Sequence, residues 1–156
     1  HYDPGARVMR LSQEVYYGNS VASIGVAAHE TGHAIQHKER YFPLVLRNSI
    51  VPIANFGSNA SWILFILGFM FGIRGLVSLG IILFTGVVVF QLVTLPVELN
   101  ASSRALKILE RRSILYGDEL EGARKVLGAA AMTYVAAALT AIANLLRLIY
   151  ISRDRD

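Results

Sequence analysis

The stretch GLVSLGIILFTGVVVFQLVTLPV, residues 75–97, contains no charged side chain. A helix needs about 20 mostly apolar residues to cross the roughly 30 Å hydrocarbon core of a bilayer, and this stretch is long enough. Two more uncharged runs of comparable length separate Arg47 from Arg74 and Lys125 from Arg147. We therefore predict a mainly helical, all-α integral membrane protein with about three transmembrane helices. These helices are expected at residues 53–73, 75–97 and 126–150.

The composition of the 156-residue chain supports this prediction. Hydrophobic residues make up 54% of the sequence and charged residues only 17%, whereas soluble domains carry about 25% charged residues. A disordered chain is excluded and an ordinary soluble domain is disfavoured. The absence of cysteine excludes disulfides, thiolate metal sites and cysteine nucleophiles. Because the sequence starts with His1 and not with Met, we expect a fragment or a processed chain.

The positions of Lys and Arg predict the orientation in the membrane. The net charge is +4, but the basic residues cluster beside the apolar runs, where they would meet lipid headgroups. We therefore expect a lipid bilayer as partner and no nucleic acid. Residues 1–52 carry five Lys and Arg and residues 98–125 carry six, against one in the turn at Arg74. Three spans put both basic segments on one face, which should be the cytoplasmic face.

The regions outside the spans belong to the same single domain in this interpretation. After a turn at residues 3–5, the alternation of residues 7–12 predicts a short strand. Ser20 can cap a helix that ends at about Arg40. We interpret residues 1–52 as an interfacial segment and residues 98–125 as a helical segment next to the membrane.

The helix after Ser20 contains HETGH, residues 29–33, an HExxH motif. His29 and His33 are four residues apart, so they project from one face of a helix and can bind the same Zn²⁺. Glu30, rotated by about 100° from His29, can reach a water at the metal without being a ligand. The motif therefore predicts a zinc hydrolase with Glu30 as the general base.

A catalytic zinc normally has three protein ligands and one position open for water. The candidates for the third ligand are His37, Glu98, His1 and Asp3. His37 is rotated roughly 80° from His29, and one straight helix does not easily offer three ligands to a tetrahedral centre. Glu98 directly follows the uncharged run 75–97, on the face that we predict for the motif, and an ionisable group there indicates function. We favour Glu98 and read His37 as a surface residue.

The oxyanion formed during peptide hydrolysis needs a donor group in addition to the metal. The spacing of the sequence does not single out this group. The strand at residues 7–12 can pair with an extended substrate, or it can belong to a small sheet with a partner upstream. The candidates for the donor or for a supporting role near the metal are His1, His37, Arg104, Tyr16, Tyr17 and Asn100.

Five blocks of the sequence together resemble a known family, the YugP-like membrane neutral zinc metallopeptidases of bacteria. The resemblance covers most of the chain, and the last two blocks are the most specific. The blocks are HYDP (1–4), RLS (10–12), VYYG (15–18), VAAHETGHAIQH (26–37) and QLVTLPVELNASSRA (91–105).

This resemblance implies a multi-pass metalloendopeptidase of the bacterial plasma membrane. By resemblance, His29, His33 and Glu98 hold the zinc and Glu30 is the base. The arrangement is also similar to HtpX-type membrane proteases, in which two spans separate HExxH from a glutamate ligand. Asn100 departs from the family pattern, which often has Asp at this position. The loss of that negative charge affects the expected tuning of the ligands.

We therefore predict a zinc endopeptidase that cleaves membrane or misfolded proteins at the cytoplasmic membrane face. One alternative is a protease that cleaves within the bilayer, but Lys38, Glu39 and Arg40 directly after the motif make its helix interfacial. Another alternative is a scaffold or transporter subunit that binds zinc without catalysis. Glu30 disfavours this alternative, because a structural zinc site uses four protein ligands and gains nothing from a base.

Overall fold

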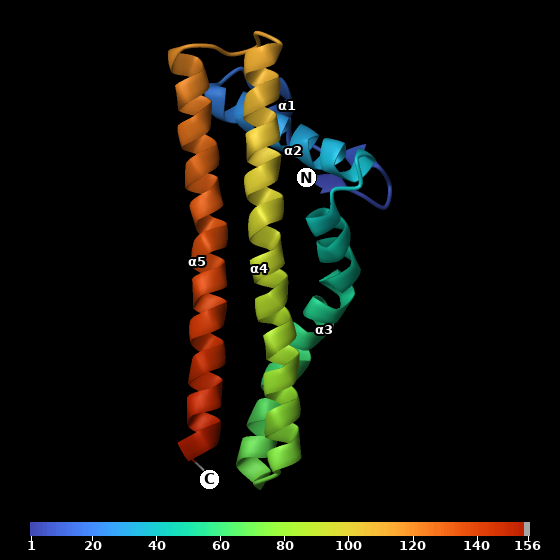
Figure 1. Ribbon diagram of the computed structural model, residues 1–156, viewed down its shortest axis with the longest axis vertical. Helices are drawn as coiled ribbons and strands as arrows, with labels where there is room; N and C mark the ends of the chain where they lie inside the picture. Colours follow the sequence, from blue (N-terminus) through green and yellow to red (C-terminus); the bar gives the residue numbers. More distant parts are fainter. Residues whose placement is uncertain (155–156) are drawn as a thin grey trace. The chain divides into compact units, whose positions relative to one another are not determined.

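The computed structural model describes residues 1–154, and the fold is 83% helical (Figure 1). This confirms the predicted mainly helical fold with a short strand region at the N-terminus. The order of the elements is β1 (Tyr2–Asp3), β2 (Val8–Met9), α1 (Gln13–Tyr17), α2 (Val21–Lys38), α3 (Phe42–Phe71), α4 (Arg74–Arg111) and α5 (Asp118–Asp154).

Within the described residues, three helices are long and apolar enough to cross a membrane: α3 with 30 residues, α4 with 38 and α5 with 37. Large apolar side chains on each of them stay exposed, for example Phe56, Ile82 and Leu139. Such side chains suit contact with lipid and not with water. The expected spans 75–97 and 126–150 lie within α4 and α5, and the expected span 53–73 lies on α3 except for its last two residues, because α3 ends at Phe71. Residues 42–52, which we expected in an interfacial segment, form the start of α3 and include Pro52.

Helix α4 continues through Pro96 to Arg111. We expected a span that ends before Glu98 and a separate helical segment after it, but both belong to this one helix. A proline inside a helix removes one hydrogen bond. The fully buried side chains that follow it, Val97, Ala101 and Ala105, retain their packing in the continuous helix. Glu98 is therefore held in the interior of a long helix and not in a loop.

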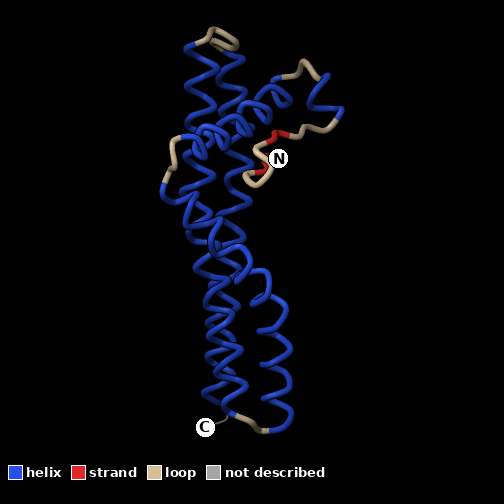
Figure 2. Tube along the Cα trace, turned by 90° about the vertical axis from the view of Figure 1, so that its right-hand side faces the viewer, coloured by secondary structure: helices blue, strands red, loops and turns tan. Residues whose placement is uncertain are grey.

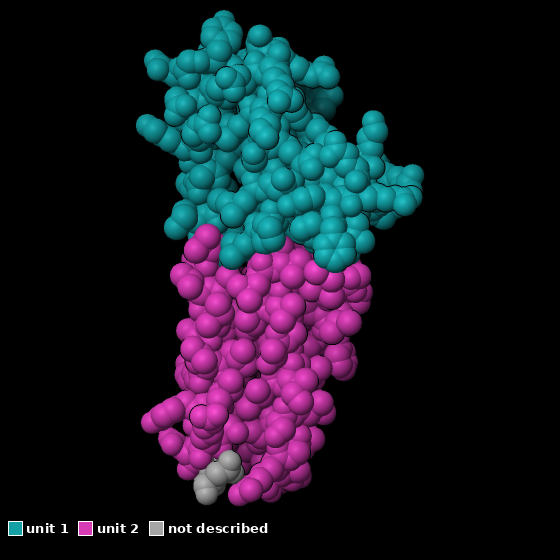
Figure 3. All heavy atoms as spheres, in the orientation of Figure 1, with its two compact units in different colours: residues 1–45, 95–134 teal, residues 46–94, 135–156 magenta. Residues whose placement is uncertain are grey.

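The chain divides into two compact units, which Figure 3 colours separately. Unit 1 contains residues 1–45 and 95–134. In its core, α2 packs against parts of α4 and α5, with small side chains such as Ala28, Ala105 and Ala123 beside Leu109 and Leu127. These small residues allow the three helices to approach closely.

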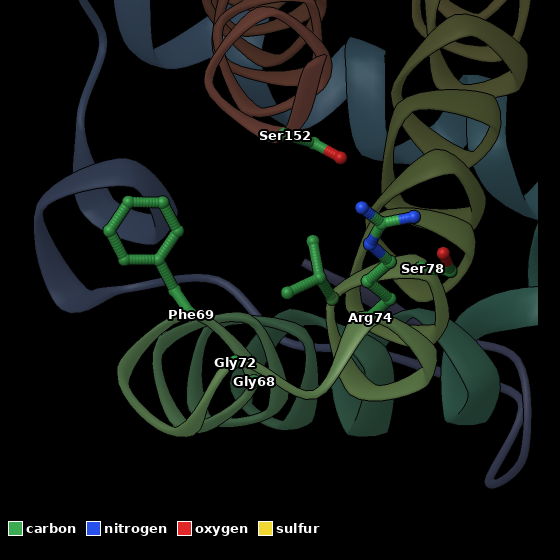
Figure 4. A pocket seen from close by; sticks show the side chains of 7 residues that line it. Gly68, Phe69, Gly72, Arg74, Ser78 and Ser152 are labelled. Carbon is green, nitrogen blue, oxygen red and sulfur yellow. The ribbon is translucent and has the colours of Figure 1, made fainter. Parts of the chain in front are cut away.

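Unit 2 contains residues 46–94 and the chain from residue 135. Its core joins α3, α4 and α5 through apolar side chains that include Phe65, Phe84 and Leu148. A cavity of about 340 Å³ lies in this unit. Figure 4 shows that the side chains of Arg74 and Ser152 face the same space there.

The N-terminal strands form a two-stranded antiparallel sheet, drawn in red in Figure 2. Tyr2 lies opposite Met9, so the partner of the expected strand is within the chain. The strand is shorter than residues 7–12, because Ser12 already caps α1 by accepting a hydrogen bond from the Val15 N–H. In the turn, Asp3 accepts hydrogen bonds from backbone N–H groups and from Arg10. These hydrogen bonds, that of the Ala6 N–H above all, lower the pKa of Asp3.

Candidate metal centre

The HETGH motif lies in the middle of α2, on the helix that the sequence predicts for it. Ser20 caps this helix, and its hydroxyl accepts a hydrogen bond from the Ser23 N–H at 3.1 Å. His29 and His33 stand one helical turn apart, with ring centroids separated by 4.7 Å. Both rings face the same neighbour, the part of α4 that belongs to unit 1.

Glu98 of α4 meets both histidines. Its Oε2 atom lies 2.9 Å from Nε2 of His29 and 3.3 Å from Nε2 of His33. One ligand atom from each of the three residues lies within 4.8 Å of the others. Among residues 1–154, this is the one cluster of three or more His, Cys, Asp or Glu side chains with such spacing. His33 and Glu98 are 8% and 3% exposed, so these two side chains are shielded from bulk water.

A glycine inside the motif makes this proximity possible. Gly32 of α2 lies against the backbone of Ala101 in α4, and a Cβ atom at Gly32 would overlap the Ala101 carbonyl oxygen. The two helices therefore approach at backbone contact distance, one turn away from Glu98. With any larger residue at position 32, the two imidazoles and the carboxylate would be held further apart.

The outer ring nitrogen of each histidine has a hydrogen-bond partner. Nδ1 of His29 lies 2.9 Å from the Ser102 hydroxyl, and Nδ1 of His33 lies 2.9 Å from Oε1 of Gln36. Both rings therefore turn Nε2 toward Glu98, as is usual for histidines that bind a metal through Nε2. Burial lowers the pKa of His33, but the hydrogen bond and charge of Glu98 outweigh burial and raise this pKa overall.

Two imidazole nitrogens and one carboxylate oxygen are the donor set of many catalytic zinc sites. The residues present thus fit zinc, because their donor atoms converge and their outer nitrogens are already engaged. A structural zinc site would have a fourth protein ligand. The described cluster has three, which leaves a position for water.

Glu30 lies beside this cluster. It lines the same pocket as His29 and Glu98, and its side chain is 16% exposed. Its Oε2 atom is 4.0 Å from the backbone nitrogen of His1. The pocket has a volume of about 180 Å³, and its remaining wall comes from α2, α4 and α5. The residues of this wall are Val26, Ser102, Leu127, Ala130, Ala131 and Tyr134.

The other candidates for a third ligand have different partners. His37 Nδ1 lies 2.6 Å from the Tyr2 hydroxyl. Asp3 holds the turn of the β1–β2 hairpin, and the backbone nitrogen of His1 donates to the Arg10 carbonyl. In the described part of the chain, the structure does not bring these three residues into the cluster of His29, His33 and Glu98.

The candidates for an oxyanion donor are also spread out. Tyr16 and Tyr17 are 68% and 80% exposed on α1 and contact each other. Arg104 donates to Glu39 and to Asn100. Tyr134 of α5, which the sequence did not single out, is the tyrosine that lines the pocket beside the cluster.

Sequence reasoning also missed Gln36 and Ser102. Gln36 follows His33 by three residues and Ser102 follows Glu98 by four, so both lie on the same helix face as a member of the cluster. A search for polar residues at these helical spacings from the motif would have found both. Tyr134 has no such signal, because it lies in α5, far from the motif in the sequence.

Comparisons with known proteins agree with this geometry. Residues 1–153 match the family described as "Putative neutral zinc metallopeptidase". The chain is 54% identical over 151 residues to "Putative membrane protease YugP" of Bacillus subtilis (strain 168), an alignment that covers 97% of this chain and 67% of that protein. No solved structure matches the chain. The predicted resemblance is confirmed: the chain belongs to the neutral zinc metallopeptidase family so described, and three of its side chains lie close enough together to hold the metal.

Proposed function

We propose that this protein is a zinc-dependent endopeptidase of the bacterial plasma membrane that hydrolyses peptide bonds at the cytoplasmic face. One observation carries the proposal. Glu98 Oε2 lies within hydrogen-bonding distance of Nε2 of both His29 and His33, and Glu30 lines the same pocket. Three ligand atoms and a separate carboxylate base are the combination that metal-assisted peptide hydrolysis requires.

In this proposal His29, His33 and Glu98 hold the zinc. When bound, the metal supplies a Lewis acid that acidifies water and polarises a peptide carbonyl. The Glu30 carboxylate accepts the proton of the attacking water and passes it to the leaving amine.

The pocket next to Glu30 supports a polypeptide substrate. Its wall combines the apolar side chains of Val26 and Leu127 with the small Ala130 and Ala131. A space of about 180 Å³ with this lining suits one apolar side chain of a peptide next to the bond that is cut. Binding of that side chain would exclude water and hold the carbonyl near the metal ligands.

The charge distribution supports a site at the membrane surface. Helix α2 ends with Lys38, and Glu39 and Arg40 follow it directly. Such charges are costly in hydrocarbon, which disfavours cleavage within the bilayer. The basic segments 1–52 and 98–125 favour the cytoplasmic face by the positive-inside rule. Membrane proteins and misfolded chains are the substrates that this position would bring near the site, by analogy with HtpX-type proteases.

The proposal is tested with the purified protein in detergent, by measuring zinc content and hydrolysis of casein. We expect E30Q to retain zinc and to lose about 10²- to 10⁴-fold in hydrolysis rate, the usual contribution of a general base. E14Q, which changes an exposed carboxylate on α1, is the matched control and should cleave like the wild type. Full hydrolysis by E30Q would refute the mechanism. A wild type that binds zinc without cleaving peptides would favour the alternative of a membrane scaffold that binds zinc without catalysis.

A further inference from the structure

A continuous chain of hydrogen bonds leads from the protein surface to His33. Arg104 donates through Nη1 to Glu39 at 2.6 Å and through Nε to Oδ1 of Asn100 at 2.7 Å. Gln36 donates to the same Asn100 oxygen at 3.0 Å. The other end of the Gln36 amide, Oε1, lies 2.9 Å from Nδ1 of His33. The chain thus links two helices of unit 1, α2 and α4, and ends on a histidine of the proposed zinc site.

The direction of each link is fixed by one obligate donor. A guanidinium group has N–H donors and no acceptor. Asn100 must therefore turn its oxygen, and not its NH₂ group, toward Arg104. Since this oxygen faces Gln36 as well, Gln36 must present its NH₂ group to Asn100.

A second acceptor fixes Gln36 in the same orientation. The Gln36 NH₂ group also donates to the backbone carbonyl of Val97 at 2.8 Å. If the amide were flipped end for end, its oxygen would lie against two other oxygens. Gln36 is completely buried, so water cannot compensate for such a reversal. Its Oε1 atom is therefore held against His33.

An amide oxygen only accepts hydrogen bonds, so Nδ1 of His33 must carry the proton that joins it to Gln36. With the proton held on Nδ1, Nε2 is the ring nitrogen that would offer its lone pair to zinc, beside Glu98. We propose that Gln36 is a positioning residue that holds His33 in the tautomer able to bind zinc through Nε2. Arg104 fixes the orientation of Asn100, and Asn100 in turn fixes that of Gln36.

The second histidine provides an internal comparison. His29 contacts the Ser102 hydroxyl through Nδ1. A hydroxyl can donate or accept, so Ser102 does not select a tautomer. The outer partners of the two histidines therefore differ: Gln36 requires a proton on Nδ1 of His33, while Ser102 can pair with Nδ1 of His29 in either form. The inference rests on the proposed zinc site and is independent of proteolysis.

The test measures tautomers and zinc affinity, and not activity. The full chain is labelled with ¹⁵N-histidine, and the ring nitrogens of His33 are recorded in detergent without metal, at alkaline pH. The wild type should show a protonated Nδ1 at His33. Q36M removes the acceptor at similar volume and should shift the proton from Nδ1 toward Nε2, which faces the Glu98 carboxylate. Its zinc affinity, measured by chelator competition, should fall about 10- to 100-fold, as for loss of other partners of metal ligands.

Two further variants keep the test informative if Q36M fails to fold. N100D keeps an oxygen that accepts from Arg104 and Gln36, so it should preserve the tautomer and most of the zinc affinity. N100L removes this oxygen and should lose both. S102A is the matched control at His29 and should leave the His33 spectrum unchanged.

The outcomes separate positioning from packing. An unchanged His33 tautomer in Q36M, or in N100L where Q36M does not fold, overturns the inference, even if zinc affinity falls. A wild type that binds zinc and shows the expected tautomer but hydrolyses no peptide would refute the proposed function and leave this inference intact.

Discussion

Gly32 of α2 and Ala101 of α4 touch through their backbones: a side chain at position 32 would have to occupy the space of the Ala101 carbonyl oxygen. Ala101 is fully buried, and it follows Glu98 by three residues on the same helix. The contact therefore sets the distance between the motif on α2 and the carboxylate on α4. The middle of HETGH is thus part of the geometry of the site, although Gly32 itself offers no ligand atom.

We expect G32A to lose zinc and stability. The added methyl group must push α2 away from α4, and overpacking of this kind costs about 1–3 kcal/mol. G128A is the control, because a Cβ atom at Gly128 meets nothing within 4 Å and alanine favours a helix. Thermal unfolding and zinc content of both variants are compared with the wild type. A G32A protein with wild-type zinc content and melting temperature would show that the close contact is not required.

The choice between Glu98 and His37 can be made by metal analysis. E98A should weaken zinc binding by more than about 100-fold, because loss of a mere hydrogen-bond partner of a ligand already costs about 10- to 100-fold. H37A should keep the metal, since His37 is engaged with Tyr2 through Nδ1. Zinc affinities of E98A and H37A, measured by chelator competition, decide whether Glu98 or His37 is the third ligand. The reverse pattern, with zinc lost in H37A and kept in E98A, would remove Glu98 from the ligand set.

Zinc binding should weaken on acidification at a higher pH than for an ordinary histidine pair. Burial alone would lower the pKa of His33, but the hydrogen bond and charge of Glu98 outweigh burial and raise it. His33 therefore keeps its proton at pH values where free histidine is already neutral, and this proton competes with zinc. In the metal-free protein, the stability gained from protonated His33 is fully present below the pKa of unfolded histidine and is lost as pH rises through the raised pKa. Chelator competition across pH measures the effect, and an affinity that stays constant until the ordinary histidine pKa is reached would contradict it.

Features that depend on neighbours in sequence could be predicted. The uncharged runs predicted three long apolar helices, and Ser20 marked the start of α2 correctly. The continuation of α4 through Pro96 was missed. The rule that proline breaks helices counts the hydrogen bond that proline removes. It does not count the burial of Val97 and Ala101, which depends on packing within unit 1.

The same limit applies to the site. The HETGH motif can be recognised in the sequence, because the spacing of His29 and His33 places both on one helix face. Glu98 stood out as an isolated charge at the end of an apolar run, and the structure brings it to the two histidines although it lies 65 residues beyond His33 in the chain. Gln36 and Asn100 are ordinary polar residues in the sequence. Their hydrogen bonds exist only once α2 and α4 are packed together.

The size of the α5 side chains that line the pocket should control which peptides are cut. Ala131 lies one helical turn from Leu127 and lines the pocket beside Glu30. A131L would fill part of the roughly 180 Å³ space. It should lower kcat/KM for peptides with a large apolar residue next to the cut by about tenfold or more, and affect peptides with alanine there much less. The control A129L adds the same volume at an exposed position of α5 outside the pocket lining. Two peptides that differ only at that residue provide the measurement. The quantity compared is the ratio of kcat/KM between these two peptides. If A131L and A129L change this ratio equally, this pocket does not receive the substrate side chain, because a substitution outside the lining would then act as strongly as one within it.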